Sequence, residues 1–215
     1  MGELCGVDEA GRGAVIGPMV VAALSADRQG VRLLQAMGVK DSKKLSEVRR
    51  RSLFLQLKAS GLRYRVKVVK PEMINAALRR NAGPGINVLE ARLISSLLEE
   101  LNPSHAYIDS PDRDLKRFRE MVARSLGGRT RIICENKADS KYPIVSAASI
   151  VAKVTRDRLV ANLRRKYGDF GSGYPSDPKT ILFIRRCIRD GALPDIVRRG
   201  WDTIYRITQT SLDEF

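Results

Sequence analysis

Apolar and polar positions follow two different patterns along the chain, and the first predicts strands that pair with their neighbours in sequence. Apolar runs at residues 4–7 and 18–26 read as buried strands. Residues 62–68 alternate apolar with basic side chains, as expected of a half-buried strand. We expect these three strands to form an antiparallel meander.

In the second half of the chain, strands alternate with helices, which is typical of parallel strands joined by helical crossovers. Short strands are expected at 106–108 and 131–134. Ser46 and Asn87 are placed to cap helices that follow them. The sequence therefore predicts an α/β fold, with a mixed five-stranded sheet flanked by helices and a helical C-terminal part. Helices are predicted over 31–37, 46–60, 87–101, 114–126, 143–167 and 179–190.

The composition favours a polyanionic partner. Among 215 residues there are 39 Lys and Arg against 24 Asp and Glu, a formal net charge of +15. Nucleic acid is the simplest partner for such a surplus, although charge alone gives no specificity. The 3 cysteines form no pattern typical of a disulfide framework or a zinc site. With no signal peptide and no apolar run long enough to cross a bilayer, the protein is expected to be cytoplasmic.

Carboxylates at strand ends are the candidate chemistry. Asp8 and Glu9 end the first strand, Asp109 ends a second, and Asp139 lies shortly after a third. In open α/β sheets ligands bind beyond the carboxyl ends of the strands, so these side chains can meet in one cleft. Gathered there they need counter-charge, which one or two Mg²⁺ or Mn²⁺ ions would supply. The alternative for Asp8 and Glu9 is an ordinary acidic turn after an edge strand.

Several polar segments occur in one order along the chain. They are DEAGRG at 8–13, DSKKL at 41–45, YIDSP at 107–111, KADSKY at 137–142, SAASIVAKVTRDR at 146–158 and GSGYPSDP at 171–178. Together they closely resemble type 2 ribonuclease H (ribonuclease HII), in particular its archaeal form, over nearly the whole chain. An ordered set of motifs is far more specific than any single one. The resemblance implies a ribonuclease H-like core with a helical C-terminal part.

The resemblance also implies an activity and a metal-binding set. The implied reaction is metal-dependent hydrolysis of RNA in RNA–DNA hybrids and at ribonucleotides embedded in duplex DNA, leaving 3′-hydroxyl and 5′-phosphate ends. A pair of Mg²⁺ or Mn²⁺ ions roughly 3.5–4 Å apart can activate a water and stabilise the leaving oxygen in such a reaction. By motif, the catalytic and metal-binding residues are Asp8, Glu9, Asp109 and Asp139.

The same resemblance implies a set of substrate contacts. The Gly-Arg-Gly turn matches the family's turn that meets the ribonucleotide 2′-hydroxyl and the adjoining phosphate, and the 2′-hydroxyl is what separates a ribonucleotide from DNA. The tyrosine of GSGYPSDP matches one that packs against the deoxyribose following the ribonucleotide. Two lysines are expected to contact phosphates. The residues concerned are Gly11, Arg12, Gly13, Tyr174, Lys43 and Lys153.

On this interpretation the chain has three parts. Residues 1–168 form the ribonuclease H-like catalytic core, and residues 169–208 form a helical part that packs on the core and supplies Tyr174. Residues 209–215 are expected to be a flexible tail.

The tail resembles a sliding-clamp-binding peptide. Gln209, Leu212 and Phe215 fit the pattern Q-x-x-L-x-x-F at the C-terminus. A frayed terminus is the alternative. The expected partners are therefore RNA–DNA hybrid, ribonucleotide-containing duplex DNA and, through the tail, a replication sliding clamp, with the enzyme itself a monomer.

Two other functions fit part of the pattern. A structure-selective DNA nuclease or resolvase of the same fold also gathers carboxylates around Mg²⁺. A non-catalytic basic nucleic-acid-binding protein would explain the charge without a reaction. The only histidine, His105, is expected at the start of a strand and away from the cleft, which argues against histidine-pair ribonuclease chemistry.

Overall fold

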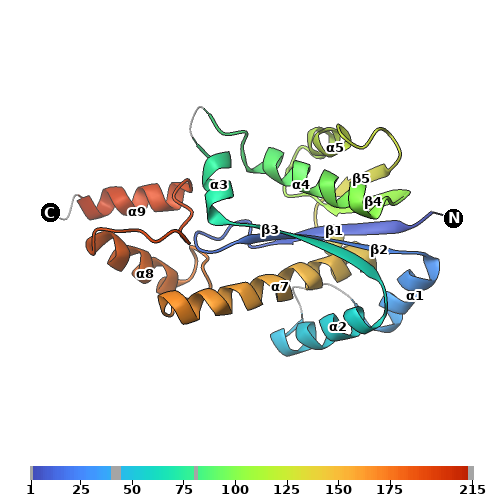
Figure 1. Cartoon of the computed structure of the whole chain (residues 1–215), viewed down its shortest axis with the longest axis horizontal. Coiled ribbons are helices and arrows are strands. Elements are labelled where there is room, and N and C mark those ends of the chain that lie inside the picture. The colour runs from blue at the N-terminus through green and yellow to red at the C-terminus, as the bar shows by residue number, and fades with distance from the viewer. Residues whose placement is uncertain (1, 40–44, 80–81, 213–215) are drawn as a thin grey trace. The chain divides into compact units, whose positions relative to one another are not determined.

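The computed structural model describes residues 2–39, 45–79 and 82–212, with side chains through residue 209. It contains a five-stranded sheet in the order β3-β2-β1-β4-β5 (Figure 1). β1 pairs antiparallel with β2 and parallel with β4, which in turn pairs parallel with β5. The predicted mixed sheet is therefore confirmed. The strands are β1 (Leu4–Ala10), β2 (Met19–Ala26), β3 (Arg63–Val69), β4 (His105–Asp109) and β5 (Arg131–Glu135).

Burial along the strands explains their sequence patterns. Every residue of β2 is buried, and β1 is buried except for Leu4 and Glu9, which are half-buried. β3 lies at the edge of the sheet and exposes part of its basic side. A strand covered on both faces reads as a continuous apolar run, whereas an edge strand with one covered face alternates.

The helices lie close to their predicted ranges. The Ser46 hydroxyl caps α2 by accepting a hydrogen bond from the Arg49 N–H over 3.2 Å, as predicted. Within the described residues, no helix has the length and apolar character needed to span a membrane. The helices are α1 (Arg28–Ala36), α2 (Glu47–Ala59), α3 (Pro71–Ala77), α4 (Ile86–Leu101), α5 (Leu115–Ala123), α6 (Ala138–Lys141), α7 (Pro143–Tyr167), α8 (Pro178–Arg189) and α9 (Asp202–Leu212).

The prediction that Asn87 caps α4 is wrong. The helix begins at Ile86, so Asn87 lies inside its first turn. The Asn87 side-chain amide instead donates to the Asp112 carboxylate over 2.8 Å, which ties the start of α4 to the loop before α5. An asparagine amide serves a local cap and a distant partner equally well, so sequence spacing alone does not choose between them.

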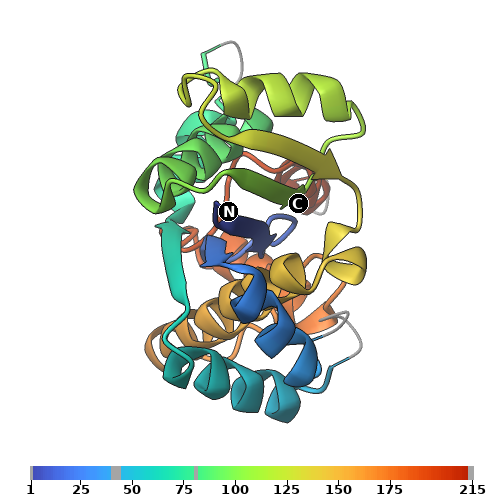
Figure 2. The same cartoon turned by 90° about the vertical axis from the view of Figure 1, so that its right-hand side faces the viewer.

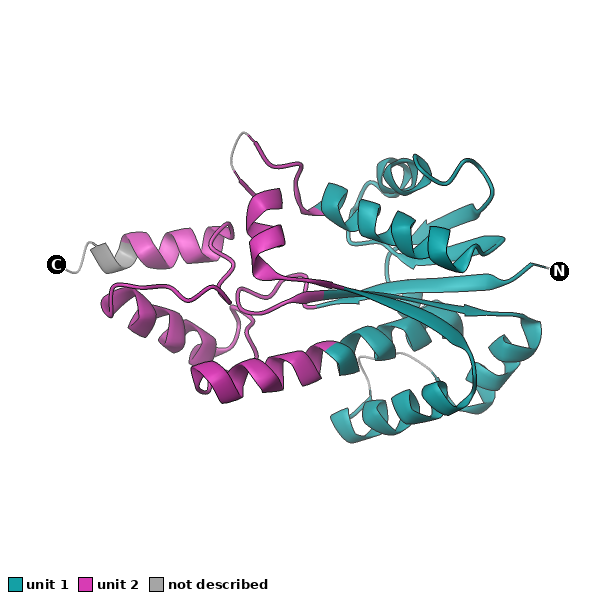
Figure 3. Cartoon of the chain, viewed as in Figure 1, with its two compact units in different colours: residues 1–10, 20–67, 87–155 teal, residues 11–19, 68–86, 156–215 magenta. Residues whose placement is uncertain are grey.

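The chain divides into two compact units (Figure 3). Unit 1 comprises residues 1–10, 20–67 and 87–155, and unit 2 comprises residues 11–19, 68–86 and 156–215. The boundaries expected from the sequence, after residues 168 and 208, stay a prediction.

In unit 1, helices cover both faces of the sheet. Figures 1 and 2 show α4 and α5 on one face and the start of α7 on the other. The Ser95 hydroxyl joins α4 to α5 by donating to the Val122 carbonyl over 2.7 Å. On the other face, a Cβ at Gly6 would lie only 2.2 Å from the Ile144 carbonyl oxygen. Glycine at this position therefore lets β1 pack directly on the first turn of α7.

Unit 2 has an apolar core of its own, built from segments far apart in sequence. Ile16 and Val197 form an antiparallel bridge, and the Gly17 N–H donates to the Ile196 carbonyl over 2.8 Å. The segment that follows β1 is thereby fixed to the C-terminal part of the chain. The buried core residues are Val15, Ile16, Val160, Phe170, Ile184, Ile196, Val197 and Ile204.

Candidate active site

Asp8 and Asp109 lie at the same end of two neighbouring parallel strands. The register pairs Val7 of β1 with Ile108 of β4, and the next residue on each strand is an aspartate. The two carboxylates are therefore brought to the carboxyl edge of the sheet, where α/β proteins bind ligands. The prediction that the strand ends at Asp109 is confirmed.

Asp139 joins them from the short helix α6, which follows β5. Lys137, just before this helix, has a left-handed backbone with φ of 57°, which few residues other than glycine adopt. The Ala138 N–H then donates to an Asp109 carboxylate oxygen over 3.0 Å and fixes the start of α6 to the end of β4. Asp139 is the next residue and is only 2% exposed.

These three aspartates form a compact donor set. One carboxylate oxygen from each of Asp8, Asp109 and Asp139 lies within 4.8 Å of the others. Mg²⁺ prefers carboxylate oxygens and holds them at about 2.0–2.1 Å, so two ligands of one ion lie about 3–4 Å apart. The residues therefore fit a hard divalent cation such as Mg²⁺ or Mn²⁺.

The electrostatics of Asp8 favour a cation in the same place. Burial raises the pKa of the Asp8 carboxyl well above its usual range, and the charges of Glu9 and Asp109 raise it further. Hydrogen bonds from the Ser149 hydroxyl and from the Glu9 N–H, at 2.7 Å, lower that pKa but do not reverse the shift. A cation beside Asp8 would stabilise its ionised form and offset the cost of burying the charge.

Glu9 lies outside this compact set among the residues that the structure describes. Glu9 directly follows Asp8 on β1, and successive side chains of a strand alternate between the two faces of the sheet. Glu9 is half-buried, whereas Asp8 is 6% exposed. The charge of Glu9 still raises the pKa of Asp8, so the two groups interact. Glu9 as a metal ligand stays a prediction.

The Gly-Arg-Gly turn begins directly after β1 and belongs to unit 2. Gly11 has φ of 81°, and a Cβ there would lie 2.0 Å from Arg156 Nε, so no larger residue fits. The fully buried Arg198 holds the turn in place. Its Nη1 donates to the Arg12 carbonyl over 2.9 Å, and its Nε donates to the Gly17 carbonyl over 2.8 Å.

Tyr174 lies in the loop before α8, also in unit 2, and is half-buried. Arg156 Cζ is 4.8 Å from the centroid of its ring, a cation–π contact. The Asp177 carboxylate shapes the loop by accepting hydrogen bonds from the Ser172 N–H over 2.6 Å and from the Lys179 N–H over 3.0 Å, the second of which caps α8. Tyr174 therefore lies in a loop whose conformation is fixed by hydrogen bonds to Asp177.

The two lysines expected to contact phosphates and the single histidine lie in different parts of the chain. Lys153 is half-buried on α7, one helical turn after Ser149. Lys43 lies outside the described residues. His105 begins β4, at the opposite end of the strand from Asp109. The expectation that the histidine lies away from the carboxylates is confirmed.

The clamp-like pattern begins inside a helix. α9 extends to Leu212, and the Gln209 side-chain amide donates to the Tyr205 hydroxyl over 2.7 Å. Helical structure through residue 212 differs from the flexible tail expected over 209–215. The helix is stabilised by tertiary packing through the buried Ile204, which a sequence pattern alone does not reveal. Phe215 lies outside the described residues.

Sequence reasoning missed three residues that shape these sites. Ser149 contacts Asp8, Arg156 contacts the tyrosine loop and the turn, and Arg198 holds the turn. Ser149 is a polar residue in the apolar first half of α7, which was a usable signal, whereas Arg156 stands in the charged run at 156–158 and reads as a surface residue. Arg198 stands beside Arg199, and a pair of arginines usually indicates a surface segment. Nothing in the sequence marks Arg198 as buried.

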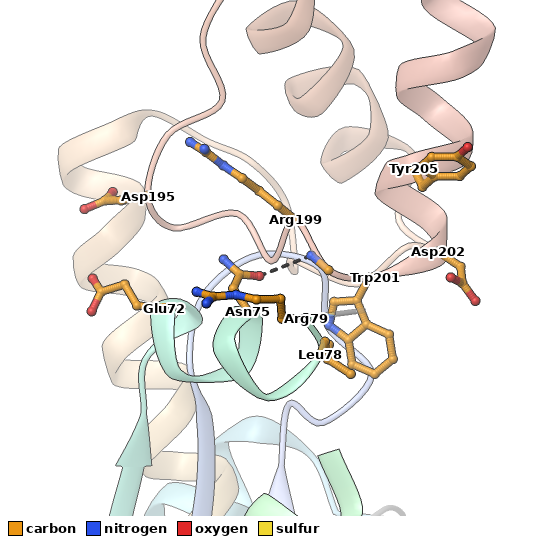
Figure 4. Close-up of a pocket in the computed structure, with 10 residues that line it drawn as sticks. Glu72, Asn75, Leu78, Arg79, Asp195, Arg199, Trp201, Asp202 and Tyr205 are labelled. Atoms are coloured by element: carbon orange, nitrogen blue, oxygen red, sulfur yellow. Dashed lines mark hydrogen bonds between the residues drawn. The ribbon is translucent and has the colours of Figure 1, made fainter. Parts of the chain in front are cut away.

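Unit 2 also contains a surface pocket of about 610 Å³ (Figure 4). Its lining includes Asn75 of α3 and Leu78 just after that helix, with Trp201 just before α9 and Tyr205 on α9. Its charged lining is mixed, with two arginines and three carboxylates. None of the candidate carboxylates lines it, so we assign it no part in the chemistry.

A mixed sheet of this order, with aspartates gathered at the carboxyl ends of its parallel strands, is the arrangement of a ribonuclease H-type nuclease. The ribonuclease HII family model matches residues 5–204, and the chain belongs to this family. It is accordingly an endoribonuclease, a hydrolase that acts on RNA in RNA–DNA hybrids.

Relatives match the chain over nearly their full lengths. Ribonuclease HII of Thermofilum pendens is 47% identical over 212 residues, covering 96% of this chain and 100% of that protein. The crystal structure of ribonuclease H2 from Pyrococcus horikoshii matches with a TM-score of 0.85 and 43% identity, covering 98% of this chain and 99% of that one. Ribonuclease HII of Archaeoglobus fulgidus, solved in a complex with PCNA, matches with a TM-score of 0.83 and 40% identity, covering 92% and 94%.

Proposed function

We propose that this endoribonuclease cleaves at ribonucleotides embedded in duplex DNA as well as in longer RNA–DNA hybrids, leaving 3′-hydroxyl and 5′-phosphate ends. The observation that carries the chemistry is the compact set of Asp8, Asp109 and Asp139 oxygens within 4.8 Å of one another. Glu9 completes the proposed catalytic set from the next position on β1.

Asp8, Glu9, Asp109 and Asp139 would hold one or two Mg²⁺ or Mn²⁺ ions. An ion held there would supply activation of the attacking water and stabilisation of the leaving oxygen. The protein supplies the geometry: β1 and β4 place two carboxylates side by side, and the Ala138 hydrogen bond keeps α6 and its Asp139 beside them. Ser149 orients Asp8 through its hydroxyl.

Substrate recognition is proposed for the turn at residues 11–13 and for Tyr174. A Cβ on Gly13 would meet nothing within 4 Å, so packing within the described chain does not require glycine there. A ligand that approaches the backbone closely would explain it. We assign the turn to the 2′-hydroxyl and its neighbouring phosphate, and Tyr174 to the following deoxyribose. Lys43 and Lys153 would contact phosphates.

The net charge of +15 supports a duplex partner, because neutralising phosphates releases counterions and strengthens binding. We also propose that the C-terminal residues Gln209, Leu212 and Phe215 dock on a replication sliding clamp. The relative from Archaeoglobus fulgidus, which was solved with PCNA, supports this partner. We further propose that the protein is a monomer and works in the cytoplasm.

The test is cleavage-site mapping on a duplex that carries one ribonucleotide, with an all-DNA duplex of the same sequence as the control. We expect one cut beside the ribonucleotide in Mg²⁺ or Mn²⁺, none in EDTA, and none on all-DNA. Cutting of the all-DNA duplex would select a DNA nuclease instead. Binding without any cutting would select a non-catalytic nucleic-acid-binding protein.

A further inference from the structure

Arg156 is a buried guanidinium whose contacts lie on two separate loops of unit 2. It is 4% exposed. Its Nε donates to the Pro18 carbonyl over 3.2 Å, in the segment that contains the Gly-Arg-Gly turn. Its Nη2 donates to the Ser172 carbonyl over 3.4 Å, in the loop that carries Tyr174. One side chain therefore joins the two loops to which substrate recognition is assigned.

The same guanidinium fills the space between the turn and the tyrosine. A Cβ on Gly11 would lie 2.0 Å from Arg156 Nε, so the turn packs directly on the guanidinium. Arg156 Cζ lies 4.8 Å from the Tyr174 ring centroid. The planar Arg156 guanidinium contacts both elements and therefore sets the distance between them. Because protein interiors are close-packed, a displacement of the turn would be transmitted to the tyrosine loop.

The main chain adds a direct link between the loops. The N–H groups of Val15 and Ile16 both donate to the Gly173 carbonyl, over 2.8 and 3.1 Å. Arg198 differs from Arg156 because its hydrogen bonds go to the Arg12 and Gly17 carbonyls, within the first loop only. The two buried arginines thus offer a natural comparison: one holds the turn, and the other joins the turn to the tyrosine loop.

We propose that Arg156 is a positioning residue that determines specificity for a ribonucleotide followed by a deoxyribonucleotide. It fixes the spacing between the turn that meets the 2′-hydroxyl and the tyrosine that meets the next sugar. This inference rests on the proposed roles of the turn and Tyr174. Loss of Arg156 should therefore weaken the preference for a single embedded ribonucleotide more than it weakens cleavage of RNA itself.

The experiment compares kcat/KM on a duplex with one ribonucleotide and on a uniform RNA–DNA hybrid, and takes the ratio as the preference. The variants are Arg156→Met, Tyr174→Ala, the double variant, Arg198→Met and Arg158→Met. Arg158 is an exposed arginine two residues after Arg156 on α7. Arg158→Met therefore makes the same change of charge as Arg156→Met without removing the buried contacts.

We expect Arg156→Met and Tyr174→Ala each to lower the preference about tenfold, and the double variant to lose no more of it than Tyr174→Ala alone. Such non-additivity marks two residues that act as one unit. Arg198→Met should slow both substrates by similar factors, and Arg158→Met should change neither.

A preference that Arg156→Met leaves unchanged, or a double variant whose losses add, would overturn the inference. If Tyr174→Ala itself leaves the preference unchanged, the proposed substrate recognition is wrong, which is a distinguishable result. Should Arg156→Met fail to fold, Arg156→Lys serves in its place. Lysine keeps the charge but lacks the planar fork that makes these contacts, so the preference should still fall.

Discussion

The Ala138 N–H donates to an Asp109 carboxylate oxygen over 3.0 Å, and this hydrogen bond joins two of the three aspartates of the candidate metal site. Asp109 ends β4, whereas Ala138 opens the helix that carries Asp139. The Asp109 carboxylate therefore holds the neighbouring helix in place through one oxygen, and it is also one of the proposed metal ligands.

Asp109→Asn should separate these two uses. The asparagine carbonyl oxygen can still accept from the Ala138 N–H, so the fold should be kept, while the charge that we propose binds metal is lost. We expect kcat to fall by at least about 10³-fold, equivalent to ~4 kcal/mol of transition-state stabilisation. Affinity for an uncleaved duplex, measured by fluorescence anisotropy, should stay within about threefold of the wild type.

Asp112→Asn is a matched control for this change, because Asp112 is a nearby aspartate that contacts Asn87 outside the aspartate set. It should leave cleavage close to the wild-type rate. Retention of substantial cleavage by Asp109→Asn would show that its charge is not needed for the reaction.

Asp8→Asn should stabilise the metal-free protein. Asp8 is buried beside Glu9 and Asp109, and burial followed by their charges raises the pKa of its carboxyl, so its ionised form costs stability when no cation is bound. We expect the free energy of unfolding in EDTA at pH 8 to rise by about 0.5–2 kcal/mol. The increase that Mg²⁺ produces in the wild type should shrink in the variant. Urea unfolding with and without Mg²⁺ measures both, and a less stable variant in EDTA would contradict this reasoning.

Asp177 should make the stability of the tyrosine loop depend on pH. Hydrogen bonds from the Ser172 N–H, from the Ser172 side chain and, to a lesser extent, from the Lys179 N–H hold the pKa of Asp177 below its usual value. A carboxyl whose pKa is lower in the folded state stabilises the protein above its unfolded pKa, and this contribution is lost as pH falls through the folded value. Asp177→Ala should therefore lower Tm at pH 7.

The difference in Tm between wild type and Asp177→Ala should narrow as the pH falls below about 4, where the unfolded carboxyl takes up its proton. Asp114→Ala removes a comparable cap from α5 and leaves the tyrosine loop intact. Only the Asp177 variant should also reduce the preference for a single ribonucleotide. Equal effects of both variants on that preference would contradict a role for the Asp177 loop in recognition.

Deleting residues 212–215 should abolish binding to the sliding clamp while sparing cleavage. The deletion removes Leu212 and Phe215 of the clamp-like pattern, which follow Gln209 in α9. Isothermal titration calorimetry against the clamp measures the first effect, and kcat/KM on the single-ribonucleotide duplex measures the second. Unchanged clamp affinity would remove the tail from the interaction.

The aspartate set could be predicted from sequence because it follows from the order of strands. Asp109 ends β4 and Asp8 lies two residues before the end of β1, and parallel strands bring their carboxyl ends to one edge. Asp139 needs more, since it reaches the edge through the left-handed Lys137 and the Ala138 hydrogen bond. The KADSKY motif identified Asp139 as a site residue, whereas local secondary-structure propensity would not have placed it there.

The rest depends on tertiary contacts that a sequence pattern does not contain. Arginine is rarely buried, so Arg156 and Arg198 read as surface residues until the structure places main-chain carbonyls around them. Asn87 lies inside the first turn of α4, and its side-chain amide donates to the Asp112 carboxylate, a contact that no local pattern predicts. The extension of α9 beyond residue 208 follows from packing of Ile204 in the core of unit 2.

The central claim is that aspartates from distant parts of the chain gather to hold divalent cations. Crystals soaked in Mn²⁺ test it most directly, because anomalous scattering locates the metal independently of the protein model. We predict at least one Mn²⁺ peak within about 2.2 Å of oxygens from Asp8 and Asp109 or Asp139, absent from Asp109→Asn crystals. Mn²⁺ bound elsewhere, with these carboxylates left empty at saturating concentration, would contradict the account.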